Sequence, residues 1–321
     1  MLASPLMLFS CSGTSLYSEG DGELKIVASS FPAFDLARQT AKDTATVTLL
    51  QSSGADLHNY TPSAQALAAL TEADIFICNG GISDQSWIDD TLLAADNPDL
   101  VIIKMVDFAQ PLLTELEGHG HSEYCHENHP HDHSHEHDHS HGDGHGHESD
   151  EHVWMSLRAA IGITRAISDA CSAKLPKNAA LYQANAEKYV AQLEALDASY
   201  ESVINASSTK TLVCADRFPF IYLTSDYEIC YYAAFSGCSS ESEASFETFV
   251  TLAEAIKANG LSYVIITENG DTELASALSE QTGCKILPLN SMQSVTAAEI
   301  SKGVTYLRIM QDNLAIIEKI L

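Results

Sequence analysis

Residues 178–206 are the stretch that most constrains how this chain can fold, because their pattern predicts one long helix. Apolar side chains recur there every three or four residues, at Leu181, Ala184, Tyr189, Leu193, Leu196 and Tyr200. A helix of about 30 residues, with a rise of about 1.5 Å per residue, is about 45 Å long. We expect it to be a stiff connector between the two parts of the chain that flank it.

Short apolar runs alternate with helical segments on both sides of this connector. Before it, we expect strands at 24–30, 46–51, 73–80 and 100–106, and helices at 31–41, 64–70, 86–95 and 153–175. After it, we expect strands at 211–215, 229–235, 261–267 and 284–289, and helices at 218–227, 245–259, 271–282 and 297–320. Such alternation is typical of parallel sheets. The predicted fold is α/β: two lobes, each a parallel sheet flanked by helices, joined by one long rigid helix, with a cleft between the lobes.

The chain has 321 residues, which is enough for two domains that each have a core of their own. We divide it into an export segment and linker at 1–22, an N-terminal lobe at 23–157, connecting helices at 158–206 and a C-terminal lobe at 207–321. The N-terminal lobe includes a histidine-rich stretch at 119–147.

This histidine-rich stretch carries twelve of the fourteen histidines, interleaved with Asp, Glu, Ser and Gly. It has no apolar face to bury, so we expect a solvated loop. Imidazole suits zinc, copper, nickel and iron, and the neighbouring carboxylates attract cations. A loop of this kind suggests metal capture or sensing without one fixed geometry; low-complexity drift without a use is the alternative. Its central auxiliary ligands are His129, His131, His133, His135, His137, His139 and His141.

The other two histidines are His58 and His152. Each follows a predicted strand of the first lobe, and open α/β sheets bind ligands at the carboxyl ends of their strands. By the same rule Asp216 and Glu268, which follow strands of the second lobe, would face these histidines across the cleft. A structural role is the alternative for all four; Asp216 can pair with Arg217 or begin a helix, and Glu268 can cap one.

Charge restricts the class of partner. The chain has 44 acidic and 16 basic residues, for a formal net charge of -28. This balance argues against nucleic acid or an anionic membrane surface as the main partner and favours cations.

The first residues, MLASPLMLFSCSG, resemble the end of an apolar export segment. LFSC resembles the lipobox of bacterial lipoproteins, in which the cysteine, here Cys11, is lipidated; Phe9 is large for its position, and no Lys or Arg precedes the run. We expect an extracytoplasmic protein, anchored by this lipid or periplasmic. The other seven cysteines form no CxxC pair, which excludes a zinc ribbon, while one or two disulfides can form in the second half.

The chain resembles the metal-specific substrate-binding proteins of bacterial ABC importers, most closely their zinc-binding members. The resemblance is carried, in order, by HNYTPSAQALAALTEADIFICNG, the histidine-rich stretch, EHVWMS, the long central helix, DRFPFIYL and SESEASFETF. It implies that Zn²⁺ binds between the lobes as the transported ion, with His58 and His152 as ligands. The family's usual third and fourth ligands are missing: Ala215 stands at one position, and Asn290 and Gln293 at the other. Asp216, Glu268 or a histidine of the loop could fill the gap.

Three functions remain open. The first is a monomeric receptor that captures zinc and delivers it to an ABC-type permease. The second is an extracellular zinc buffer or sensor that acts through the histidine-rich stretch. The third is a zinc hydrolase, which the sequence favours least: it has no HExxH, GxSxG or P-loop motif, and Glu151 is the nearest candidate base.

Overall fold

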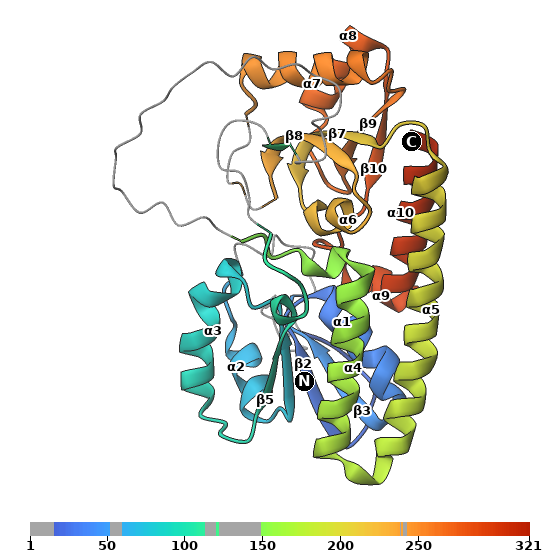
Figure 1. Ribbon diagram of the computed structural model, residues 1–321. Helices are drawn as coiled ribbons and strands as arrows, with labels where there is room; N and C mark the ends of the chain where they lie inside the picture. Colours follow the sequence, from blue (N-terminus) through green and yellow to red (C-terminus); the bar gives the residue numbers. More distant parts are fainter. Residues whose placement is uncertain (1–15, 52–59, 113–119, 122–148, 238, 240–242) are drawn as a thin grey trace, which may run out of the picture.

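Two α/β lobes lie one above the other, with a long helix along one side of both (Figure 1). The structure is a computed structural model that describes residues 16–51, 60–112, 120–121, 149–237, 239 and 243–321. The predicted α/β class, with two lobes joined by a long helix, is confirmed, because each lobe is built on a sheet that is mainly parallel. The metal cleft between the lobes stays a prediction.

The sheet of the first lobe has the order β1-β3-β2-β4-β5. Its strands are β1 (Tyr17–Glu19), β2 (Leu24–Ala28), β3 (Ala45–Leu49), β4 (Ile75–Cys78) and β5 (Val101–Lys104). Only β1, which sequence analysis placed in a linker, runs antiparallel to its neighbour. Its Tyr17 ring packs edge-on against Phe34, with 5.7 Å between the ring centroids. The linker prediction was therefore wrong for these three residues, because this contact and the pairing with β3 order them.

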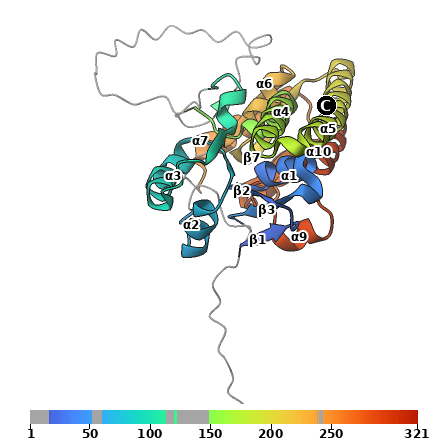
Figure 2. The ribbon, with the colours of Figure 1, turned by 90° about the horizontal axis from the view of Figure 1, so that it is seen from below.

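Helices cover both faces of the first sheet (Figure 2). They are α1 (Phe31–Ala41), α2 (Ala64–Thr71), α3 (Ile82–Ala95), α4 (Leu157–Lys174) and α5 (Ala179–Ala206). Neighbouring strand residues point to opposite faces, so Ile26 and Ile75 pack in the cluster with α1, α4 and α5, whereas Val27 and Phe76 pack with α2 and α3. Burial on both faces explains why these strands are continuous apolar runs in the sequence.

The sheet of the second lobe has the order β10-β9-β7-β8-β6. Its strands are β6 (Gly120–His121), β7 (Thr211–Phe218), β8 (Cys230–Ser236), β9 (Tyr263–Thr267) and β10 (Lys285–Leu289). The short strand β6 comes from the histidine-rich stretch and pairs antiparallel with β8. These two residues therefore differ from the solvated loop expected for the whole stretch, whose remainder lies outside the described residues.

The helices of the second half are mostly as predicted. They are α6 (Ile221–Asp226), α7 (Phe246–Ala258), α8 (Glu273–Thr282), α9 (Ala297–Ser301) and α10 (Tyr306–Ile320). The described short 3-10 helices all come earlier in the chain, before α5: η1 (Lys42–Thr44), η3 (Met105–Phe108), η5 (Val153–Met155) and η6 (Pro176–Asn178). One closing helix was predicted where α9 and α10 are observed. The break has a local cause: Gly303 has a φ of 91°, and the Thr305 side chain accepts a hydrogen bond from the Arg308 backbone to begin α10.

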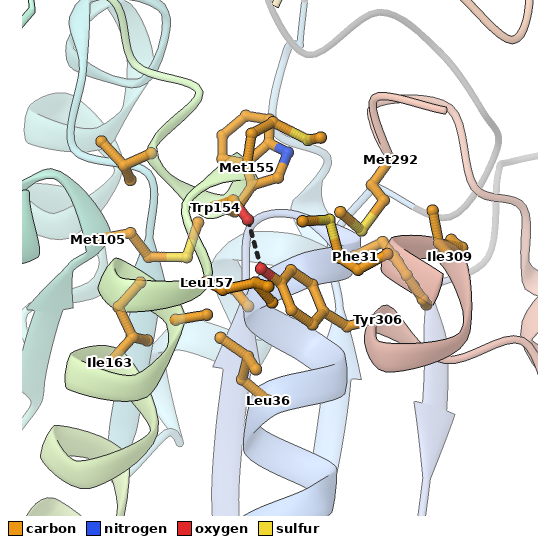
Figure 3. Packing of buried hydrophobic residues seen from close by; sticks show 14 of the residues in the cluster. Phe31, Leu36, Met105, Trp154, Met155, Leu157, Ile163, Met292, Tyr306 and Ile309 are labelled. Atoms are coloured by element: carbon orange, nitrogen blue, oxygen red, sulfur yellow. Dashed lines mark hydrogen bonds between the residues drawn. The ribbon is translucent and has the colours of Figure 1, made fainter. Parts of the chain in front are cut away.

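A continuous apolar core joins the two lobes. Figure 3 shows Trp154, just before α4, packed with Phe31 and Leu36 of α1 and Tyr306 of α10. The Tyr306 hydroxyl donates a hydrogen bond of 2.6 Å to the Trp154 carbonyl. Helix α10 thus begins against the first lobe and runs beside α5 (Figure 1). The Tyr200 hydroxyl of α5 donates a hydrogen bond to the Met310 carbonyl of α10.

Within the described residues, no helix is both long and apolar enough to cross a membrane. Cys230 is disulfide-bonded, and its partner lies outside the described residues. Four described cysteines are free and buried: Cys78, Cys171, Cys214 and Cys284.

Candidate metal site

A cavity of about 780 Å³ opens at the carboxyl ends of β7, β8 and β9. Among the described residues, five carboxylates and one guanidinium line it, so its field attracts cations. The charged lining residues are Asp216, Arg217, Glu243, Glu268, Asp271 and Glu273.

His152 stands immediately before η5 with its side chain fully buried, and it contacts Gln293, a residue that lines this cavity. The Trp154 ring packs edge-on against the imidazole, with 5.2 Å between the centroids. The indole nitrogen of Trp154 in turn donates to the Ser291 carbonyl at 2.9 Å. Trp154 therefore covers one side of the His152 imidazole.

Asp150 fixes the orientation of the imidazole. Its Oδ1 atom accepts a bond of 2.8 Å from the His152 backbone nitrogen and lies 2.9 Å from His152 Nδ1. Because a carboxylate oxygen accepts, Nδ1 carries the proton and Nε2 keeps its lone pair for a metal. Asp150 Oδ2 is buried without a hydrogen-bond partner in the part of the chain that the structure describes. An unpaired buried carboxylate oxygen fits a site that receives a cation.

Gln293 contacts the second ring nitrogen of His152, the one that does not face Asp150. Its Nε2 atom lies 2.7 Å from His152 Nε2, and its Oε1 atom accepts from the Ser291 hydroxyl at 3.1 Å. Gln293 also lines the cavity. His152 Nε2 therefore points toward a residue that lines the cavity.

Gly237, at the end of β8, leaves room for these two side chains. A Cβ atom built on Gly237 would lie 2.9 Å from Asp150 Oδ2 and 3.0 Å from both His152 Cε1 and the Phe218 carbonyl oxygen. Real Cβ atoms essentially never approach a neighbour closer than 3.0 Å, and contacts at 3.0 Å are tighter than nine in ten of those observed. Glycine is needed here for close approach of the backbone.

Glu268 is held by the turn that follows β10. Its Oε2 atom accepts from the Ser291 backbone nitrogen at 2.8 Å, and its Oε1 atom accepts from the hydroxyls of Ser291 and Ser294 at 3.0 Å each. Both carboxylate oxygens are therefore engaged in pinning the turn that carries Gln293. These contacts are structural, but they differ from the helix cap that was the predicted alternative for Glu268.

Asp216 lies inside β7, although sequence analysis placed it after a strand that ended at Ala215. The strand continues because Arg217 and Phe218 pair with β8 beyond a bulge. For the same reason the helix predicted at 218–227 is shortened to α6. Asp216 Oδ2 accepts from both the backbone nitrogen and the hydroxyl of Thr267, and it packs directly against Gly270. Asp216 thereby ties β7 to the turn after β9.

The structure does not assemble the predicted ligand set. Among the described residues, no group of three or more His, Cys, Asp and Glu side chains could hold a metal ion. His58, Cys11 and the seven auxiliary histidines from His129 to His141 lie outside those residues. The ligand roles of His58, His152, Asp216 and Glu268 therefore remain predictions.

Sequence reasoning missed Asp150 and Gly237 and dismissed Gln293 as a poor ligand. For Asp150 a signal was available, since a carboxylate two residues before a candidate histidine can bond back to both its backbone and its ring. No local pattern marks Gly237 or Gln293, because each meets His152 only through the folding of distant segments.

Comparison with known proteins agrees with this architecture. The model of the family described as zinc-uptake complex component A, periplasmic, matches residues 26–320. The zinc-binding lipoprotein AdcA of Streptococcus pneumoniae is 32% identical over 312 residues, which are 96% of this chain and 57% of that protein. The chain thus spans little more than half of this relative. The high-affinity zinc uptake system protein ZnuA of Bacillus subtilis is 26% identical, with 96% of this chain and 92% of that protein covered.

Solved structures show the same fold. A crystal structure of the Zn(II)-bound ZnuA-like domain of S. pneumoniae AdcA aligns with a TM-score of 0.71 at 29% identity, covering 93% of this chain and 99% of that domain. The lipoprotein YcdH of B. subtilis, described as metal-dependent, aligns with a TM-score of 0.73 at 21% identity, covering 93% of this chain and 100% of that one.

Proposed function

Because this chain belongs to the family of zinc-uptake complex component A, we propose that it is an extracytoplasmic receptor that binds Zn²⁺ and delivers it to an ABC-type permease. The bound zinc is cargo, and the members named above are zinc-binding or zinc-uptake proteins.

The observation that carries the proposal is the Asp150–His152 pair. A buried imidazole whose Nδ1 proton is held by a carboxylate presents Nε2 as a fixed metal ligand, which is the usual arrangement around zinc-binding histidines. The acidic lining of the adjoining cavity supports a cationic cargo over an anionic one.

We propose His58 as a second ligand, as the family resemblance implies. Glu268 and Asp216 are weaker candidates, because each would have to give up hydrogen bonds to the turns that it holds. A histidine of the 119–147 stretch is the remaining candidate for completing the four ligands that zinc prefers.

Zinc titration against a competing chelator tests the receptor function. We expect one tight zinc in the intact protein and in a variant that lacks residues 122–147, which keeps β6 in place. His152→Ala should remove that zinc in both. If the deletion abolishes tight binding while His152→Ala leaves it intact, the protein is instead a buffer that acts through the histidine-rich stretch.

Delivery requires the protein to lie outside the cytoplasm. We propose lipid attachment at Cys11, as the lipobox-like LFSC motif predicts, and the relative AdcA is described as a lipoprotein. Deleting the gene in its own cell should slow growth when zinc is chelated, and added zinc should restore growth. Cys11→Ser should release the protein from the membrane fraction; a protein that remains there contradicts the anchor.

The hydrolase alternative has little support. Glu151, its candidate base, is buried with its carboxylate against Gly81 at the beginning of α3, where the helix dipole stabilises a negative charge. The family to which the chain belongs consists of transport receptors.

A further inference from the structure

Gln293 places its side-chain amide on the nitrogen of His152 that a metal would use. The two Nε2 atoms are 2.7 Å apart, within hydrogen-bond distance. We propose that Gln293 is a displaceable amide cover, which occupies the lone pair of His152 Nε2 in the empty protein and must leave before zinc binds. The inference rests on the proposed zinc-binding function. It means that Gln293 lowers the affinity for zinc, whereas a ligand would raise it.

The direction of this hydrogen bond follows from the neighbouring atoms. Asp150 accepts from Nδ1, so the proton lies on Nδ1 and Nε2 can only accept. The amide nitrogen of Gln293 is the donor that this requires, while the amide oxygen faces the Ser291 hydroxyl. Each hydrogen bond that links Asp150, His152, Gln293 and Ser291 thus has one donor and one acceptor.

A rigid turn presents Gln293 to the histidine. Met292 has a φ of 64°, in the left-handed region, and its backbone nitrogen donates to Asn290 Oδ1 at 2.8 Å. Asn313 holds Asn290 from α10 by two bonds, at 2.9 and 2.8 Å, and Glu268 holds Ser291. Because the turn is fixed at several points, the amide returns to the same place whenever the metal leaves.

The Ser291 hydroxyl is shared between the turn and the side chain of Gln293. Ser291 has one hydroxyl proton, which lies within reach of both Gln293 Oε1 at 3.1 Å and Glu268 Oε1 at 3.0 Å. A charged carboxylate is the stronger acceptor, so it takes the larger share of that proton. If the Gln293 amide turns away, the Ser291 proton stays bonded to Glu268, so this contact of the turn is kept.

Gln293→Ala tests the proposal in a zinc titration against a competing chelator. Zinc no longer has to break a hydrogen bond to Nε2, so we expect the affinity to rise about 3- to 10-fold. A fall in affinity would show that Gln293 is a ligand, and a change of less than about twofold would show that the contact has no effect; either result overturns the proposal. If the alanine variant does not fold, Gln293→Leu is judged by the same criterion, because an apolar side chain of similar size can neither donate to Nε2 nor bind zinc.

Two controls separate this inference from the function on which it rests. Gln281→Ala removes an exposed amide from α8 and should leave zinc affinity unchanged. If His152→Ala does not weaken zinc binding, the proposed site itself is wrong. If His152→Ala weakens binding but Gln293→Ala does not strengthen it, only the amide cover is refuted. Nitrogen NMR of the zinc-free protein supplies a second readout, because the His152 Nε2 resonance should shift when its donor is removed.

Discussion

At the scale of single residues, the site depends on how one histidine is oriented. His152 binds Asp150 through both its backbone nitrogen and its ring, so two short bonds fix the imidazole in place. The sequence predicted His152 because histidine is scarce outside one stretch and because it follows a strand. Its partner across the fold, Gln293, is 141 positions away, and no local pattern could indicate the contact.

Replacing Asp150 with Asn should weaken zinc binding about 10- to 100-fold, as is usual for partners of metal-bound histidines. The amide keeps the size of the carboxylate but removes the negative charge that strengthens Nε2 as a ligand. Competition titration measures the change. Asp90→Asn, at an exposed position of α3, is the matched control. Equal affinities for the Asp150 variant and the wild type would mean that this carboxylate does not support the metal.

Gly237→Ala should weaken zinc binding without preventing folding, because the added methyl pushes on Asp150 and His152. Gly260→Ala is the control. Gly260 has open space around it but a φ of +60°, so that variant should lose stability through backbone strain and keep its zinc affinity. The account fails at this position if Gly237→Ala binds zinc as the wild type does.

At the scale of elements, periodicity identified nearly all of the strands and helices that surround the site. It failed where tertiary contacts or a single glycine decided the outcome. Strand β7 extends through Arg217 because β8 pairs with it, and the closing helix is interrupted at Gly303. The first failure moved Asp216 from a loop into a strand, where it binds Thr267. Asp216 is therefore a weaker candidate ligand than the predicted strand boundary suggested, because its carboxylate is already bonded to Thr267.

The carboxyl group of Asp226, the last residue of α6, bonds to the residue that begins α4, and its pKa is raised. Asp226 accepts a bond of 2.6 Å from Ser156, the residue that begins α4. Burial raises the pKa of Asp226 above 3.8, although the Ser156 bond and Arg158 oppose the rise. The folded protein therefore holds this proton more tightly than the unfolded chain does, so the free energy of unfolding falls as pH rises from 3.8 through the raised pKa.

Asp226→Asn should remove this contribution. Urea denaturation between about pH 4 and pH 7 should show the variant gaining stability relative to the wild type as pH rises, with the difference levelling off above the raised pKa. Parallel stability curves would contradict the assignment of the pH dependence to Asp226.

At the scale of the whole molecule, the two lobes share one core and are tied by helices α5 and α10. Asp35 of α1 is fully buried at this junction. It accepts from Arg38 Nε at 2.5 Å and from the Tyr306 backbone nitrogen, the first of α10, at 2.7 Å. Burial raises the pKa of the Asp35 carboxyl, and Arg38 opposes that rise. The sequence predicted α5 as the connector but gave no sign that α10 begins on the first lobe.

Asp35→Ala should lower the free energy of unfolding by about 3–5 kcal/mol, since it leaves the partly buried Arg38 and a backbone donor without this acceptor. Asp43→Ala, at an exposed position of η1, should change it by less than about 0.5 kcal/mol. Urea denaturation measures both. A loss below about 1 kcal/mol for Asp35→Ala would show that the junction is held by apolar packing alone.

The central claim is that zinc binds at His152 Nε2, and crystals of the zinc-loaded protein test it directly. Anomalous diffraction at the zinc absorption edge should show a peak about 2.0–2.1 Å from Nε2, with the Gln293 amide turned away from that atom. Zinc bound only elsewhere, with Gln293 still on His152 Nε2, would contradict the account.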